Sequence, residues 1–177
     1  MILFAGIEIN DSSRDLCVTL QKYLRGQTVG SFPARENFHV TLAYFGDVDE
    51  QTKNRIEEIL KAYPVPRCSL QLVRMSAFAG PKGDMVVLLA RAPESLMEYR
   101  DRLVQRFGQE GIFVDAKPFR PHVTLVRAKK KCVWLDGIRF TPTVTPVERA
   151  VLFKSYPSGQ KRIYEPLLTV EAVKNEE

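Results

Sequence analysis

The sequence predicts one globular domain in which strands alternate with helices and one structural plan is used twice. Its length of 177 residues suits a single domain rather than a multidomain assembly. Hydrophobic residues make up 45% and charged residues 27%, a globular composition that excludes a disordered or fibrous chain. The third observation is an internal repeat that relates about residues 1–45 to about residues 84–128.

The first repeat is predicted to begin with a strand and a helix. Residues 1–9 are apolar and β-prone, and the polar segment 10–13 is typical of a helix start. Ser12 and Asp15 lie at capping-box spacing, which predicts that Ser12 caps the helix. The apolar positions that recur at helical spacing are Leu16, Leu20, Tyr23 and Leu24. A loop then leads to a strand over about 37–45.

Two further helices are predicted. The first has Asp47 or Asp49 as its cap and ends before Pro64. Its apolar stripe consists of Ile56, Ile59, Leu60 and Tyr63. The second begins at Pro93 and is closed by Gly108 and Gly111, after an apolar stripe of Leu96, Tyr99, Leu103 and Phe107. The remaining predicted strands cover about residues 68–78, 85–90, 121–127, 147–154 and 163–170.

The repeat is clearest around one tetrapeptide. A shift of 83 residues places Phe38–Leu42 on Pro121–Leu125, where the four residues His-Val-Thr-Leu are identical. These two copies contain the only two histidines of the chain. Chance similarity of composition would not preserve order, spacing and the sole histidines together.

The twin tetrapeptides predict a phosphoryl-transfer site. Because side chains alternate along a strand, His39 and Thr41 lie on one face, and so do His122 and Thr124. If the two units pack about an approximate twofold axis, both polar faces meet in one cleft. One histidine can then act as a base and the other as an acid near neutral pH. The threonine hydroxyls can donate to phosphate oxygens.

Other chemistries fit the pattern less well. A single histidine in a strand is more often a satisfied structural group, and it is the pair that favours catalysis. Two histidines without a cluster of cysteines or carboxylates do not complete a metal site. No nucleophile-elbow sequence supports Ser-His-Asp catalysis, and the glycines at 80–83 lack the P-loop pattern.

The sequence resembles the two-histidine (2H) phosphoesterases, which are defined by two His-x-Thr-x motifs. The resemblance is strongest to the RNA 2',3'-cyclic phosphodiesterase branch, also called 2'-5' RNA ligases. It is carried by Asn37–Leu42 with Phe45–Val48, by Phe119–Arg127, and by Ser155, Gly159 and Tyr164–Leu167. It implies a bilobal α+β fold, a single domain over residues 1–177, in which two pseudo-symmetric lobes with antiparallel sheets line a central cleft and the helices lie outside.

The resemblance also implies an activity and its residues. The terminal 2',3'-cyclic phosphate of RNA is expected to be hydrolysed to a 2'-phosphate without a metal or a cofactor. His39 is expected to be the proton donor to the leaving 3'-oxygen and His122 the proton acceptor that activates water. Thr41, Thr124 and Arg127 are expected to bind the phosphate. Because the acid and base can run in reverse, 2'-5' ligation of RNA ends is expected as a side activity.

Charge and aromatic residues add candidates for RNA binding. The formal net charge is +5, and the excess is concentrated between Asp115 and Arg139. The cations that can follow an RNA backbone are Arg35, Arg120, Lys154, Lys161 and Arg162, and the run Lys129–Lys131 is either a solvated loop or the lip of a binding cleft. The aromatic residues that can stack on a base are Tyr44, Phe119 and Tyr156, whereas Phe45 is expected in the core.

The remaining expectations concern the setting of the protein. No apolar run approaches the roughly 20 residues of a membrane span, and no secretory signal is evident. Cys17, Cys68 and Cys132 are widely spaced and odd in number, which predicts reduced thiols and a cytoplasmic location. A monomer is expected. Two alternatives stay open: a non-catalytic RNA or nucleotide binder, and a phosphodiesterase acting on small cyclic nucleotides or an ADP-ribose cyclic phosphate.

Overall fold

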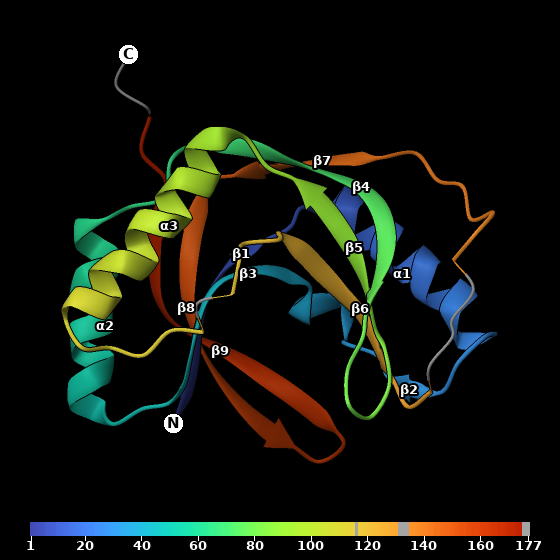
Figure 1. Cartoon of the computed structure of the whole chain (residues 1–177), viewed down its shortest axis with the longest axis horizontal. Coiled ribbons are helices and arrows are strands. Elements are labelled where there is room, and N and C mark those ends of the chain that lie inside the picture. The colour runs from blue at the N-terminus through green and yellow to red at the C-terminus, as the bar shows by residue number, and fades with distance from the viewer. Residues whose placement is uncertain (116, 131–134, 175–177) are drawn as a thin grey trace.

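The computed structural model describes residues 1–115, 117–130 and 135–174. Within these residues the chain folds into one curled antiparallel sheet that is covered by three α-helices (Figure 1). The architecture is α+β, as the sequence predicts. No helix in this described part of the chain is long and apolar enough to cross a membrane.

The elements follow the chain in an order that alternates strands and helices in its first two thirds. They are β1 (Ile2–Glu8), α1 (Asp11–Arg25), β2 (Gly30–Ser31), a 3₁₀ turn (Arg35–Asn37), β3 (His39–Asp47), α2 (Glu50–Ala62), β4 (Cys68–Phe78), β5 (Met85–Arg91), α3 (Glu94–Gln109), β6 (His122–Ala128), β7 (Thr143–Val147), β8 (Arg149–Ser158) and β9 (Lys161–Glu171). The starts of β1, α1 and β3 each lie 83 residues before the starts of β5, α3 and β6.

The sheet consists of two groups of strands that meet at a narrow joint. The order is β7-β4-β5-β6-β3-β1-β8-β9, and the short β2 pairs with β6. Long ladders hold each group together, but β3 and β6 share a single register pair, Val40 with Val123. The joint therefore lies inside the two copies of the tetrapeptide, and the strands diverge on either side of it.

The hydrophobic core lies on the face of the joint that carries the valines. Val40 and Val123 are fully buried, and they belong to the same cluster as Leu20 and Leu24 of α1 and Phe107 of α3. Helices α2 and α3 lie side by side at one end of the sheet, and α1 lies at the other (Figure 1). With the helices packed on this face, the opposite face is left for His39 and His122.

The helix starts confirm two of the predicted caps and correct a third. Asp49 caps α2, because its side chain accepts from the Thr52 amide at 2.8 Å, and α3 begins directly after Pro93. In α1 the cap is Asn10 rather than Ser12, since Asn10 Oδ1 accepts from the Ser13 amide at 3.1 Å. Ser12 instead donates to Asn10 Oδ1.

The strand predictions need two further corrections. Val147 ends β7 rather than beginning β8, and neither β7 nor the two-residue β2 was expected. Both new strands are short and lie outside the apolar runs, so periodicity gave no signal for them. Tyr23 and Tyr63 sit on the predicted helix stripes but are 44% and 43% exposed.

Candidate active site

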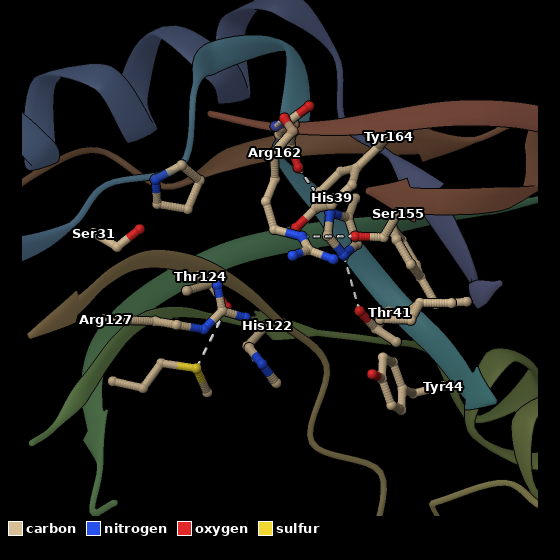
Figure 2. Close-up of a pocket in the computed structure, with 15 residues that line it drawn as sticks. Ser31, His39, Thr41, Tyr44, His122, Thr124, Arg127, Ser155, Arg162 and Tyr164 are labelled. Atoms are coloured by element: carbon tan, nitrogen blue, oxygen red, sulfur yellow. Dashed lines mark hydrogen bonds between the residues drawn. The ribbon is translucent and has the colours of Figure 1, made fainter. Parts of the chain in front are cut away.

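The joint between β3 and β6 brings the two tetrapeptides face to face. Because Val40 and Val123 point into the core, the residues on either side of them point the other way. His39, Thr41, His122 and Thr124 consequently line one cavity of about 550 Å³ (Figure 2). Arg127, three residues beyond Thr124, lines the same cavity. The structure thus collects all five predicted site residues in one place.

His39 is held by two hydrogen bonds that determine how its ring is protonated. Its Nδ1 lies 2.7 Å from the Asn37 carbonyl oxygen, which can only accept, so Nδ1 carries a proton. Its Nε2 lies 2.9 Å from Thr41 Oγ1. In the neutral ring Nε2 is therefore the basic nitrogen, and it accepts from the Thr41 hydroxyl.

Aromatic rings surround His39 and lower its pKa. The ring centroid of Phe4 lies 4.7 Å and that of Tyr164 5.4 Å from the His39 ring. This burial is the main reason why the pKa of His39 falls from 6.5 to about 4, and the charges of His122 and Arg127 lower it further. The unliganded protein consequently keeps His39 neutral at pH 7.

His122 repeats the same anchoring in a more open environment. Its Nδ1 donates to the Arg120 carbonyl oxygen at 2.7 Å, which leaves Nε2 as its basic nitrogen. Phe78 packs edge-on against it with 5.0 Å between ring centroids. Burial again lowers the pKa, followed by the charges of Arg120 and Arg127. Both histidines thus present an unprotonated nitrogen, the one suited to accept a proton.

Thr124 and Arg127 supply donors to the cavity, while the Thr41 hydroxyl is engaged with His39 Nε2. Thr124 Oγ1 finds only a weak acceptor, Met85 Sδ at 3.7 Å, so its hydroxyl can turn to a better one. Among the described residues the Arg127 guanidinium has no ion-pair partner, and Figure 2 shows it extending into the cavity beside Thr124. A cavity with a guanidinium that has no ion-pair partner among the described residues and a hydroxyl that can turn is suited to an anion.

Comparison with known proteins identifies the family. A model of the 2'-5' RNA ligase superfamily matches residues 19–133, which is more than half of the chain. The chain belongs to the 2'-5' RNA ligase superfamily.

Individual members of the superfamily give the same result over longer stretches. A protein of Archaeoglobus fulgidus named RNA 2',3'-cyclic phosphodiesterase is 29% identical over 132 residues, 74% of either chain. The protein of that name from Escherichia coli is 26% identical over 93% of both chains. The crystal structure of E. coli LigT complexed with 3'-AMP superimposes with a TM-score of 0.79 at 20% identity and covers 97% of both chains. The predicted fold is thereby confirmed.

Within this superfamily fold, three residues with no predicted catalytic role contribute to the cavity. Arg162 of β9 enters it, and its Nε donates to Ser155 Oγ of β8 at 2.9 Å, which leaves its two terminal nitrogens facing the cavity (Figure 2). Asn37 donates from Nδ2 to the Arg162 carbonyl oxygen at 2.9 Å and so connects this hairpin to the first motif. The sequence signal for Ser155 and Asn37 was the resemblance to the 2H phosphoesterases, and Arg162 was a candidate cation for following an RNA backbone.

The structure shows which of the other RNA-binding candidates line a cavity and which do not. Tyr44, Phe119, Arg120 and Lys129 all line a second cavity next to the first. Arg35 is paired with Asp11 and Asp15, and Phe45 packs in the core against Phe107. Lys154, Lys161 and Tyr156 line neither cavity, and Lys131 and Cys132 lie outside the described residues.

The described residues contain no cluster of side chains suited to bind a metal ion. Nowhere in residues 1–115, 117–130 and 135–174 do three or more His, Cys, Asp or Glu side chains come together in a way that suits a metal ion. Metal-independent catalysis remains a prediction, to be tested with a chelator.

Proposed function

We propose that this protein is an RNA 2',3'-cyclic phosphodiesterase that opens the terminal cyclic phosphate of RNA to a 2'-phosphate. The observation that carries the proposal is the pair of imidazoles, each anchored through Nδ1 to a backbone carbonyl, that face one cavity lined with anion ligands. The curated relatives that match most of the chain are named RNA 2',3'-cyclic phosphodiesterase, and this supports the same substrate here.

The reaction needs one base and one acid. In the proposed scheme His122 Nε2 takes a proton from a water molecule, whose oxygen then bonds to the phosphorus. The bond from phosphorus to the 3'-oxygen breaks, and His39 Nε2 delivers its proton to that oxygen. No covalent intermediate with the protein forms. The more open position of His122 suits the residue that must meet a water molecule.

His39 must be protonated before it can act as the donor. Its pKa near 4 means that the unliganded protein lacks this proton at pH 7. An anionic phosphate a few ångströms away favours the charged imidazolium and opposes the effect of burial and of Arg127. We therefore propose that His39 takes up a proton when the substrate binds. The donor is thus charged only when there is an ester to cleave.

The proposed phosphate ligands come from both groups of strands. Thr41 of β3 and Thr124 of β6 offer hydroxyls, and Arg127 offers a planar pair of N–H donors. Arg162, fixed by Ser155, adds a second guanidinium from the far side of the cavity. Two guanidiniums can neutralise the extra negative charge of the monoester product. The same arrangement run in reverse would give 2'-5' ligation as a side activity.

The proposed setting is a cytoplasmic monomer that uses neither a metal nor a cofactor. Cys17 and Cys68 are unpaired thiols, which is consistent with a reducing compartment.

The test is direct. Purified protein in EDTA is incubated with a short RNA that ends in a 2',3'-cyclic phosphate, and the terminal phosphate is identified. We expect a 2'-phosphate, and a loss of about 10²–10⁴-fold in kcat for His39→Ala and for His122→Ala. Thr19→Ala, which changes an exposed threonine of α1, is the control and should keep full activity. An untouched cyclic end, with tight binding or with turnover of small cyclic nucleotides only, would contradict the proposal.

A further inference from the structure

A second cavity opens directly beside the catalytic one. It has a volume of about 990 Å³ and shares with the first cavity Thr41, Tyr44, Met85, His122 and Arg127. A molecule that occupies the catalytic cavity can therefore continue into the second without leaving the protein surface. Tyr44, which is 45% exposed, lines both cavities.

The second cavity combines flat apolar surfaces with a cationic rim. Phe78, Pro81 and Phe119 line it together with Lys82 and Lys129. The carboxylates that line it are Asp84 and Asp115, and Asp115 faces Lys117 at 3.6 Å. Aromatic faces beside a chain of cations are the general means by which proteins bind single-stranded nucleic acid.

Arg120 connects this cavity to a third, more basic groove. Its guanidinium lies 4.5 Å above the Phe78 ring, which itself packs against His122. Arg120 also lines a groove of about 600 Å³ whose other charged residues are Arg74 and Arg91. No carboxylate lines this groove, and none of the three arginines forms an ion pair within the described part of the chain. The groove is thus a site of uncompensated positive charge.

The strand register places this groove in line with the catalytic base. Leu89 of β5 is paired with His122 on one side and with Arg74 of β4 on the other. Directly paired residues share a face of the sheet, so Arg74 lies on the face of His122, two strands away, at about 10 Å from strand spacing. Arg91 follows Leu89 by two residues and lies on that face too.

We propose that the RNA strand preceding the cyclic phosphate crosses the second cavity and continues along Arg120, Arg74 and Arg91. This inference rests on the proposed function, because it takes the cyclic end to be at the histidines. A 2',3'-cyclic phosphate terminates its strand, so the chain can leave the site in the 5' direction only. A cyclic mononucleotide has no further phosphates to reach Arg74 and Arg91. The groove therefore selects oligonucleotides over mononucleotides.

The first arm of the test measures binding without turnover. The probe is a fluorescently labelled six-nucleotide RNA that already ends in a 2'-phosphate, and its anisotropy is followed at several salt concentrations. In the double variant Arg74→Gln, Arg91→Gln we expect weaker binding and a salt slope smaller by about 1.4, at roughly 0.7 for each lost phosphate contact. The control is Arg67→Gln, Arg102→Gln, which removes the same charge at exposed positions that line none of the three cavities.

The second arm measures turnover of a cyclic mononucleotide. We expect both double variants to keep wild-type kcat/KM on it, because the catalytic cavity is unchanged. A variant at Arg74 and Arg91 that binds the six-nucleotide RNA like the control would overturn the proposed path and leave the proposed activity intact. Absence of turnover by the wild-type protein would contradict the activity, while the anisotropy arm would still decide whether the arginine groove binds RNA.

Discussion

The two catalytic candidates use the same local arrangement with different surroundings. Each histidine donates through Nδ1 to the carbonyl oxygen two residues earlier, Asn37 for His39 and Arg120 for His122. The backbone just before each strand therefore fixes the orientation of the imidazole ring, and both copies of the repeat have this arrangement. The difference lies in the neighbours, since His39 is enclosed by Phe4 and Tyr164, whereas among the described residues His122 contacts one aromatic ring, that of Phe78. Equal anchoring with unequal burial would allow two identical side chains to perform the different steps of the proposed reaction.

At this scale we predict that Arg127→Gln raises the pKa of both histidines. Burial is the largest cause of their low pKa values, but the Arg127 charge lowers both, and its removal leaves the imidazolium with less repulsion. The measurement is an NMR titration of the ring protons, which are easily assigned because the chain has two histidines. Arg102→Gln, on the outer face of α3, serves as the control. An unchanged His39 titration in Arg127→Gln would argue against the electrostatic coupling.

At the scale of elements, the short strand β2 pairs with β6, the strand that carries His122 and Arg127. Gly30 pairs with Ala128 and Ser31 with Arg127, and Ser31 lines the catalytic cavity. A Cβ atom at Gly30 would lie 2.3 Å from the Arg127 carbonyl oxygen, far closer than atoms can approach. β2 can therefore lie against β6 only because residue 30 has no side chain.

We predict that Gly30→Ala displaces β2, destabilises the fold by about 1–3 kcal/mol and weakens phosphate binding through Arg127. Gly108→Ala is the matched control, because its Cβ would meet no atom within 4 Å and alanine favours the α3 helix by up to about 1 kcal/mol. Urea unfolding and the KM of the cyclic phosphate substrate measure the two effects. A Gly30→Ala protein with wild-type stability and KM would show that β2 does not position Arg127.

At the scale of the whole molecule, the site depends on one narrow contact between two groups of strands. The core on one side of Val40 and Val123 holds the groups together, and the cavity on the other side exists because the strands diverge there. Residues of β1, β2, β3, β5, β6, β8 and β9 line the cavity. The candidate site and the core thus depend on the same joint.

The burial of His39 beside this joint predicts that the fold is sensitive to acid. Between the His39 pKa of about 4 in the folded protein and the usual value near 6.5, the unfolded chain binds a proton that the folded protein does not. The free energy of unfolding should therefore fall as the pH drops from about 6.5 to about 4. Urea unfolding at pH 7.0 and 4.5 measures the loss, which should be smaller in His39→Gln. An equal loss in the variant would assign the acid sensitivity to other groups.

The sequence by itself predicted the three helices and, through the repeated tetrapeptide, His39, Thr41, His122 and Thr124 of the cavity, whereas the α+β class and Arg127 came from the resemblance to the 2H phosphoesterases. It could do so because apolar periodicity and a repeated tetrapeptide that holds the only two histidines are local patterns. Local patterns can be recognised in a sequence without knowing how the chain packs. The helix cap at Asn10 was missed because several neighbouring polar residues can each serve as a cap.

Only the tertiary structure decided which distant residues join the site. Arg162 and Ser155 come from the last hairpin, and Phe4 comes from the first strand. Their approach depends on strand order and register, which link positions far apart in the chain and leave no periodic trace in it. The low pKa of His39 has the same origin, because burial is a property of the assembled core rather than of any sequence segment.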